Sequence, residues 1–382
     1  MYLKRATQVS FNRYLQSFPV VGVTGPRQSG KSTLLQHALP HYTYITFDEE
    51  FNIATFEDDP QAFIQQHNNQ VIFDEVQFVP KLFHMIKAAV DKDRQNYGRF
   101  VLTGSSQFSF LQKISESLAG RIGLLTQLPL QYSEMPKALL QASVYQGGYP
   151  ELVLRDYQNA DLWYSSYFDT YLMKDVRTLM QIGDIRDFRR LIQLLATQVS
   201  QTLDLSFYAK NIGVSVPTIK RWLSVLEASY IIFLLPPYYK NFGKRITKSP
   251  KIYFVDTGLI SYLTGIQDDD LYNKGPMAGP IFENYVVSEI FKKLKSSAIN
   301  AELFYFRTQD KAEIDLIVDY KQHADFIEIK KSSTYTPRMA SALKSYATKP
   351  DRKLVLYQGE TLQHHEIEVL NYADYLQEGV II

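Results

Sequence analysis

A glycine-rich segment near the start of the sequence has the residue types and spacing to bind phosphate. Gly25 and Gly30 enclose four residues, and Lys31 and Ser32 follow directly, which matches the pattern G-x-x-x-x-G-K-[ST]. Glycines let the backbone approach phosphate oxygens closely, and the N–H groups at a helix start attract the anion. We expect the lysine to reach the β- and γ-phosphates and the serine hydroxyl to ligate Mg²⁺. The pattern therefore predicts a site for Mg·ATP, and the alternative is a glycine-rich turn with an incidental lysine. The residues expected to contact the nucleotide are Gly25, Pro26, Arg27, Gln28, Ser29, Gly30, Lys31, Ser32 and Thr33.

Two adjacent carboxylates follow the apolar run 71–73. Asp74 is expected to hold Mg²⁺ through water, and Glu75 to polarise the water that attacks the γ-phosphate. The alternative is an acidic strand end without a catalytic role. Together with the phosphate-binding segment, this pair predicts ATP hydrolysis rather than nucleotide binding alone.

Hydroxyl groups and one arginine offer further candidates for contact with the γ-phosphate. The apolar run 100–102 is followed by Thr103, Ser105 and Ser106, and we expect Ser105 to sense the phosphate, with the other two as substitutes. A capped strand end is the alternative. Arg121 follows the next helical segment and could serve as an arginine finger, in its own chain or in a partner, or could form a structural ion pair.

A second constellation lies near the C-terminus, in the order Glu283, Asp315, Glu328, Lys330. This order matches the PD-(D/E)XK pattern of nuclease-like folds. Asp315 and Glu328 are expected on adjacent strands, where they could chelate Mg²⁺, and Glu283 could complete the metal shell. Glu328 and Lys330 share one face of a strand, and Lys330 would activate water against a phosphodiester. The alternatives are a strand pair with solvated charges and a nuclease fold kept for binding without cleavage.

The elements that would position these residues divide the chain into three parts, predicted at residues 1–150, 151–270 and 271–382. The first alternates short apolar runs with helical patterns, which predicts an α/β fold with a parallel sheet covered on both faces. The middle part is helical up to about residue 200. Residues 203–256 then give helix, turn, helix, strand, loop and strand, which predicts a winged helix. Lys220 and Arg221 could touch DNA phosphates there, or the module could serve only for packing. The last part predicts a helix over 281–296, several strands, a helix near 337–348 and a final strand over 353–357.

Composition limits the function classes. The 382 residues are 45% hydrophobic and carry a formal net charge of +1, so a strong overall field for nucleic acid is absent. No cysteine occurs, which excludes disulfides, thiolate zinc sites and cysteine nucleophiles. We find neither a signal peptide nor a long apolar run, which predicts a cytoplasmic protein without a membrane partner.

Five short motifs in one order resemble a known family. They are 25–33 (GPRQSGKST), 73–77 (FDEVQ), 102–106 (LTGSS), 117–121 (SLAGR) and 147–151 (GGYPE). Together they are similar to the prokaryotic AAA+-like ATPases that carry a C-terminal domain of unknown function. The resemblance implies an ATPase core, a winged-helix segment and a restriction-endonuclease-like C-terminal domain.

We therefore expect an ATP-hydrolysing protein that uses ATP and Mg²⁺. Its P-loop domain would control a nuclease-like domain that binds or cleaves DNA or RNA. The alternative is a nucleotide-controlled switch or scaffold whose inactive nuclease fold recruits a partner. A homo-oligomer is required only if Arg121 acts on a neighbouring chain.

Overall fold

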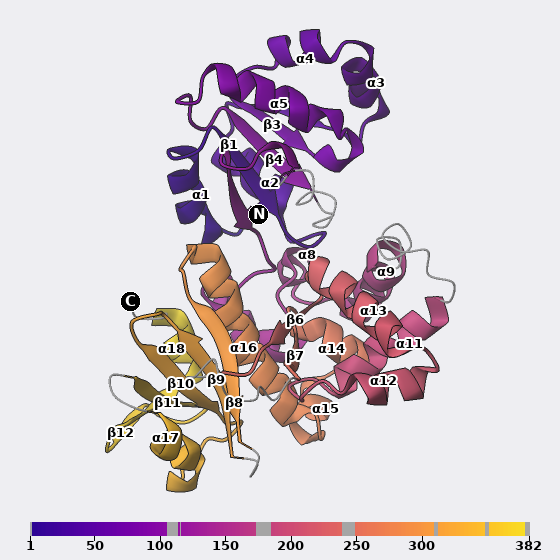
Figure 1. Cartoon of the computed structure of the whole chain (residues 1–382). Coiled ribbons are helices and arrows are strands. Elements are labelled where there is room, and N and C mark those ends of the chain that lie inside the picture. The colour runs from indigo at the N-terminus through magenta and orange to yellow at the C-terminus, as the bar shows by residue number, and fades with distance from the viewer. Residues whose placement is uncertain are drawn as a thin grey trace.

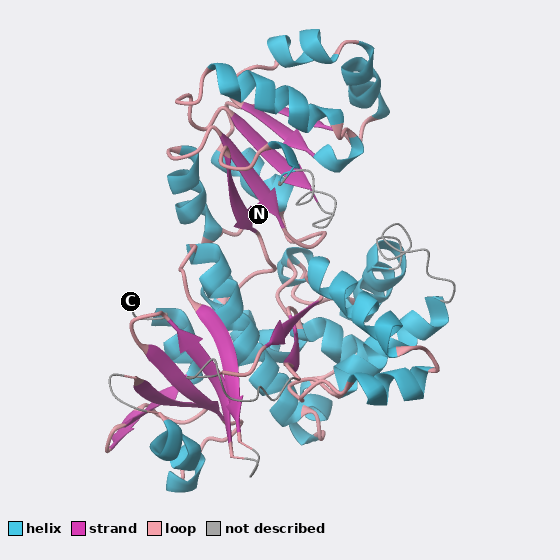
Figure 2. Ribbon diagram, viewed as in Figure 1, coloured by secondary structure: helices cyan, strands magenta, loops and turns pink. Residues whose placement is uncertain are grey.

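The computed structural model describes residues 2–104, 114, 116–172, 185–238, 249–308, 312–347 and 351–378. The chain forms an upper lobe from its first third and a larger lower body from the rest (Figure 1). Helices cover both faces of the sheet in the upper lobe (Figure 2). Among the described residues, no helix combines the length and apolarity needed to cross a membrane.

The upper lobe is built on five parallel strands in the order β2-β3-β4-β1-β5. The strands are β1 (Val20–Thr24), β2 (Thr43–Thr46), β3 (Val71–Asp74), β4 (Phe100–Gly104) and β5 (Ile122–Thr126). The helices are α1 (Thr7–Leu15), α2 (Lys31–Ala38), α3 (Glu50–Asp58), α4 (Pro60–Gln66), η1 (Val76–Phe78) and α5 (Lys81–Lys92). Two separate apolar clusters cover the two faces of the sheet. This arrangement confirms the predicted α/β fold with a parallel sheet.

The middle of the chain is helical, as predicted. Its elements are η2 (Tyr132–Glu134), η3 (Lys137–Leu139), α7 (Leu140–Gln146), α8 (Pro150–Leu154), α9 (Ala160–Ser166), the π-helical η4 (Tyr167–Leu172), α11 (Ile185–Thr197), α12 (Leu205–Ile212), α13 (Val216–Ala228), β6 (Ile232–Leu235), β7 (Lys251–Phe254), α14 (Thr257–Thr264) and α15 (Asp269–Lys274). Gly213 ends α12 with a left-handed φ of 86°, and the Ser215 side chain caps α13. β6 and β7 pair antiparallel. These elements follow the expected order, and the winged-helix assignment itself stays a prediction.

The last part of the chain packs helices against a six-stranded mixed sheet in the order β12-β13-β11-β10-β9-β8. Its elements are α16 (Ala278–Ser297), β8 (Glu302–Arg307), β9 (Glu313–Asp319), β10 (Ala324–Ile329), η5 (Pro337–Ala340), α17 (Ser341–Tyr346), β11 (Arg352–Tyr357), β12 (Leu362–His364), β13 (Ile367–Asn371) and α18 (Tyr372–Glu378). The sequence predicted the last strand at 353–357, so β12, β13 and α18 were missed. The strand β12 is short and largely exposed, whereas β13 alternates buried Ile367 and Val369 with more exposed residues and pairs with β11.

The helix α16 joins the parts of the molecule. Asn284 on α16 accepts a hydrogen bond from the Phe254 backbone N–H at 2.7 Å and donates to the Phe254 carbonyl at 3.0 Å, so it binds the helix to β7. Further along, Glu289 accepts a hydrogen bond from the Tyr132 backbone N–H at 2.5 Å and pairs with Lys292 at 2.7 Å. One apolar core extends through the middle and C-terminal parts around this helix. The predicted boundary between residues 270 and 271 stays a prediction, since the core continues across it.

Candidate functional site

The phosphate-binding segment requires glycine at two positions. Gly25 directly follows β1 and has a φ of +146°, and a Cβ atom there would lie 2.0 Å from the Gln127 carbonyl oxygen. Gly30 has a φ of +88° and directly precedes α2. The close approach of Gln127 and the two glycine conformations therefore fix the loop between β1 and α2. We use the name P-loop for residues 25–32.

The Lys31 ammonium lies within the P-loop. Its Nζ atom donates to the Gly25 carbonyl at 3.1 Å and to the Pro26 carbonyl at 2.9 Å. The residue is buried at the first position of α2, where backbone N–H groups also point toward the loop. A compact positive charge and a helix start thus face the same space, which is the arrangement that binds phosphate.

The two predicted magnesium ligands of the P-loop region touch each other. The Ser32 hydroxyl donates to Asp74 Oδ2 at 2.9 Å, although 42 residues separate them. The Tyr44 hydroxyl on β2 also donates to Asp74. A hydroxyl and a carboxylate beside a phosphate-binding loop fit the oxygen ligands that Mg²⁺ takes. The sequence did not single out Tyr44, because one tyrosine in a short strand carries no signal. Burial and the Asp74 contact raise the pKa of Tyr44 well above its usual value.

Glu75 directly follows β3 in a left-handed backbone conformation, with a φ of 55°. Its backbone N–H donates to Asp74 Oδ1 at 3.1 Å, and its side chain accepts from the Gln77 amide. Left-handed φ values are uncommon for residues other than glycine, and they are concentrated at functional sites. The strand order, with β4 between β1 and β3, brings Glu75 to the same edge of the sheet as the P-loop.

A buried arginine, Arg5, is hydrogen-bonded to the backbone of the P-loop. The sequence patterns did not predict this contact. Arg5 donates to the Ser29 carbonyl of the P-loop at 2.7 Å and to the Leu128 carbonyl at 2.7 Å. Its Nε atom pairs with Glu134 at 3.2 Å, and both side chains are about 95% buried, with exposed fractions of 5% and 4%. Arg5 therefore connects the loop to the segment that follows β5. No sequence pattern announces such a contact, because its partners are 24 to 129 residues away.

A cavity of about 400 Å³ lies beside the P-loop. It is bounded by the first residues of the chain, by the P-loop and by α8, and the N-terminus lies near α8 in Figure 1. The lining residues are Tyr2, Leu3, Arg5, Gln28, Gly30, Thr33, Leu130, Pro150, Glu151, Leu154 and Arg155. A volume of this order is within the usual range for small-molecule sites.

Two further predictions for the γ-phosphate have different outcomes. Ser105 and Ser106 lie outside the described residues, and Thr103 is buried at the end of β4. Arg121 directly precedes β5, which runs parallel to β1, so it lies at the amino ends of the strands. The P-loop follows the carboxyl end of β1, at the other end of the strands. Its guanidinium pairs with Asp91 at 2.7 and 3.0 Å. The structure does not bring Arg121 to its own P-loop, and its geometry favours the structural ion pair.

The C-terminal constellation also comes together. Asp315 on β9 and Glu328 on β10 lie on adjacent strands, and Lys330 pairs with both, at 3.3 and 2.6 Å. Glu283 reaches the same cluster from α16. It accepts a hydrogen bond at 3.0 Å from Lys251 on β7, and Lys251 lies 3.8 Å from Asp315. We call these five residues, together with Glu313, the carboxylate cluster.

The carboxylate cluster does not fit a divalent metal as the residues lie. The prediction was that Glu283, Asp315 and Glu328 hold Mg²⁺, yet no three acidic or histidine side chains in the described part of the chain are arranged to hold a metal ion. The physical reason is Lys251, whose ammonium lies between Glu283 and Asp315. No sequence pattern indicated Lys251, because it is a single lysine at the start of β7 and Glu283 lies 32 residues further along the chain.

Two glutamates of the carboxylate cluster, Glu283 and Glu328, have raised pKa values. Burial, with Asp315 nearby, raises the pKa of Glu283 to about 7 and that of Glu328 to about 8. The pKa of Lys251 is well above its usual value, because Tyr253 and the surrounding carboxylates outweigh the effect of burial. At neutral pH, protons on the two glutamic acids and the charges of Lys251 and Lys330 therefore offset the negative charge.

Replacing Glu328 with glutamine should change how stability depends on pH. The folded-state pKa of about 8 exceeds the unfolded value of 4.5, so the folded protein holds the extra proton between these values. Stability of the wild type therefore falls as pH rises through this window. As pH rises from 6 to 8, the unfolding free energy of Glu328→Gln should increase by roughly 1–2 kcal/mol relative to that of the wild type. Unfolding free energies at both pH values test this, with Glu302→Gln as an exposed control. An equal difference between variant and wild type at both pH values would contradict it.

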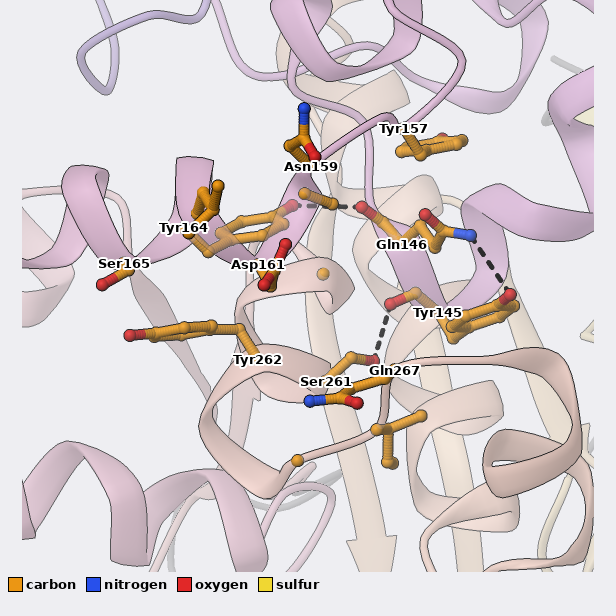
Figure 3. A pocket seen from close by; sticks show the side chains of 15 residues that line it. Tyr145, Gln146, Tyr157, Asn159, Asp161, Tyr164, Ser165, Ser261, Tyr262 and Gln267 are labelled. Atoms are coloured by element: carbon orange, nitrogen blue, oxygen red, sulfur yellow. Dashed lines mark hydrogen bonds between the residues drawn. The ribbon is translucent and has the colours of Figure 1, made fainter.

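A second cavity, of about 590 Å³, lies between α7, α9 and α14 (Figure 3). The hydroxyl groups of Tyr164 and Ser261, which line this cavity, are hydrogen-bonded to other parts of the protein. Tyr164 donates to the Gln146 carbonyl at 3.1 Å and to Asp256 at 2.7 Å, and Ser261 donates to the Tyr145 carbonyl at 2.6 Å. These bonds attach α9 and α14 to α7, so we assign this cavity a structural role.

Family models match three successive parts of the chain. An AAA domain matches residues 17–136. Two domains of unknown function match residues 137–270 (DUF8612) and 278–375 (DUF4143). The first match covers the parallel sheet and the P-loop, so this lobe is a P-loop ATPase-type domain.

The chain is also similar to whole proteins. An uncharacterized protein of Mycobacterium tuberculosis is 30% identical over 361 residues, which cover 94% of this chain and 80% of that protein. An uncharacterized protein of Haemophilus influenzae is 22% identical over 398 residues, which cover 93% of each. This chain belongs to the same family as the mycobacterial protein, a P-loop ATPase family with an AAA domain.

Among solved structures, the Walker-type ATPase of Pyrococcus abyssi is 15% identical, with a TM-score of 0.48, over 69% of this chain and 96% of that chain. AMPPCP-bound DnaA from Aquifex aeolicus is 15% identical, with a TM-score of 0.30, over 58% of this chain and 85% of that chain.

Proposed function

We propose that the chain binds and hydrolyses Mg·ATP at the P-loop. The observation that carries this proposal is the contact of Ser32 with Asp74, directly beside Glu75. Lys31 would neutralise charge on the β- and γ-phosphates, and Glu75 would orient and polarise the attacking water. A magnesium ion held by Ser32 and Asp74 would supply further stabilisation of the phosphate charge.

The cavity beside the P-loop is the proposed place for the nucleoside. It borders Gln28, Gly30 and Thr33 of the loop region, so a nucleotide with its phosphates on the loop can extend into it. Arg5 lines the same cavity while it supports the Ser29 carbonyl. The nucleoside and the phosphates would thus be held by one connected set of residues.

Glu75→Gln tests the hydrolysis step. The amide cannot accept the proton of the attacking water, so turnover should fall by about 100-fold or more, the usual contribution of a general base. Binding of a fluorescent ATP analogue should persist, since the P-loop is unchanged. Glu57→Gln, an exposed residue on α3, is the matched control. Wild-type turnover in Glu75→Gln would reject the assignment of this residue.

We further propose that the nucleotide state controls a nuclease-like C-terminal domain that engages DNA or RNA. Support comes from four residues that follow the order of the nuclease pattern: Glu283 on α16, Asp315 on β9, Glu328 on β10 and Lys330 directly after β10. Lys220 and Arg221 on α13 would add phosphate contacts. Multiple-turnover ATP hydrolysis measured with and without DNA or RNA tests this proposal. Stimulation by nucleic acid is the expected result, and the same rate in both conditions would speak against it.

The second candidate is a nucleotide-controlled switch or scaffold with an inactive nuclease fold. The specific observation in its favour is the Lys251 ammonium among the cluster carboxylates. A switch should copurify with tightly bound nucleotide and turn over slowly. Fast turnover that releases product freely would reject it.

A further inference from the structure

We propose that the ammonium of Lys251 is the resident cation of the carboxylate cluster and keeps divalent metal ions out of it. The C-terminal domain then engages its ligand without metal-dependent cleavage. The proposed nuclease-like fold could either cleave nucleic acid or bind it without cleavage, and the position of Lys251 favours binding without cleavage. It rests on that proposed fold, and it does not depend on ATP hydrolysis.

Lys251 is built into the cluster. Its side chain is only 2% exposed, and its Nζ atom lies 3.0 Å from Glu283, 2.5 Å from Glu313 and 3.8 Å from Asp315. The Tyr253 hydroxyl, two residues along β7, donates to the same Glu283 oxygen at 2.7 Å. A lysine on the surface would sample many rotamers, whereas here burial and three carboxylates hold one position.

Lys330 occupies the other side of the cluster. Its Nζ atom lies 2.6 Å from Glu328 and 3.3 Å from Asp315 Oδ2, which also accepts from the Ile329 backbone N–H at 2.9 Å. Each of the three carboxylates predicted as metal ligands therefore has an oxygen engaged by an ammonium group. Asp315 is contacted by an ammonium on each of its two oxygens.

Charge argues in the same direction. A divalent ion bound by Glu283 and Asp315 would lie within a few ångströms of the Lys251 ammonium, where two cations repel strongly in a buried setting. Removal of Lys251 would leave Glu283, Glu313 and Asp315 short of one positive charge, which Mn²⁺ could supply.

Manganese binding to the full chain tests the proposal. The parent protein carries Asp74→Asn, which removes the acidic ligand of the P-loop, and no nucleotide is added. Titration with MnCl₂, followed by electron paramagnetic resonance of free Mn²⁺ and by thermal unfolding, should show no saturable site in the parent. Lys251→Met, which keeps an apolar stem, should bind Mn²⁺ at least about tenfold more tightly and gain Tm with added Mn²⁺. Lys274→Met, an exposed lysine on α15, should behave like the parent.

The outcomes are decisive in either direction. Saturable Mn²⁺ binding by the parent that Asp315→Asn removes would overturn the proposal, whether or not the Lys251 variants fold. A folded Lys251→Met protein that gains no Mn²⁺ binding would also overturn it, and Lys251→Gln provides a second variant. Mn²⁺ binding that appears with Lys251→Met and disappears when Asp315→Asn is added would support it. None of these measurements uses ATP, so a failure of the hydrolysis proposal is seen separately.

Discussion

Lys31→Ala is expected to lower ATP turnover by about 100-fold or more while the protein stays folded. One charged donor aimed at developing negative charge contributes about this much to a rate. The buried Lys31 ammonium lies inside the P-loop, against the Gly25 and Pro26 carbonyls.

Steady-state phosphate release and circular dichroism measure the two parts of this prediction for Lys31→Ala. Lys81→Ala, at the exposed start of α5, is the matched control and should keep wild-type turnover. Turnover at the wild-type level in Lys31→Ala would exclude the P-loop as the hydrolysis site.

Arg5→Ala should destabilise the upper lobe by about 3–5 kcal/mol, the usual effect of removing one partner from a buried ion pair. The truncation leaves Glu134 without the Arg5 cation, and it removes the Arg5 hydrogen bonds to the carbonyls of Ser29 and Leu128. The P-loop should lose its support, so ATP affinity should fall together with stability.

Thermal unfolding and ATP-analogue binding check the Arg5 prediction. Arg13→Ala, an exposed arginine on α1, is the control and should change neither quantity. Arg5→Lys keeps the charge but cannot serve three acceptors in the same geometry, so it should be intermediate. Wild-type stability and wild-type affinity in Arg5→Ala would show that these contacts contribute little.

Local patterns were enough to predict the parallel sheet, the P-loop and the acidic pair after β3. Gly25, Gly30 and Lys31 are close in sequence, and their chemistry depends on that spacing. Asp74 was predicted from a strand end, and the parallel order of strands brings it to Ser32. The meeting of Asp315, Glu328 and Lys330 was also predictable, because they belong to neighbouring strands.

The contacts that sequence could not predict are made across long distances by single residues. Arg5, Tyr44 and Lys251 belong to no recurring spacing, and each gains its role only through the fold. Lys251 changes the interpretation of the C-terminal constellation, since its ammonium contacts Glu283 and Asp315, two of the three carboxylates predicted as metal ligands. Arg121 is the opposite case. Its position in the sequence suggested an arginine finger, but in the structure its guanidinium pairs with Asp91, away from the P-loop of its own chain.

The position of α16 has a consequence for how the protein is made. Tyr132 bonds to Glu289, 157 residues further along the chain, and Leu130 bonds to Lys292. At about 5–20 residues per second, a ribosome needs roughly 8–30 s to add that length. The strands of the first lobe can pair early, but the segment after β5 must wait for the helix. During that interval, the apolar side chains of the segment after β5 cannot pack against α16, and a chaperone could bind them.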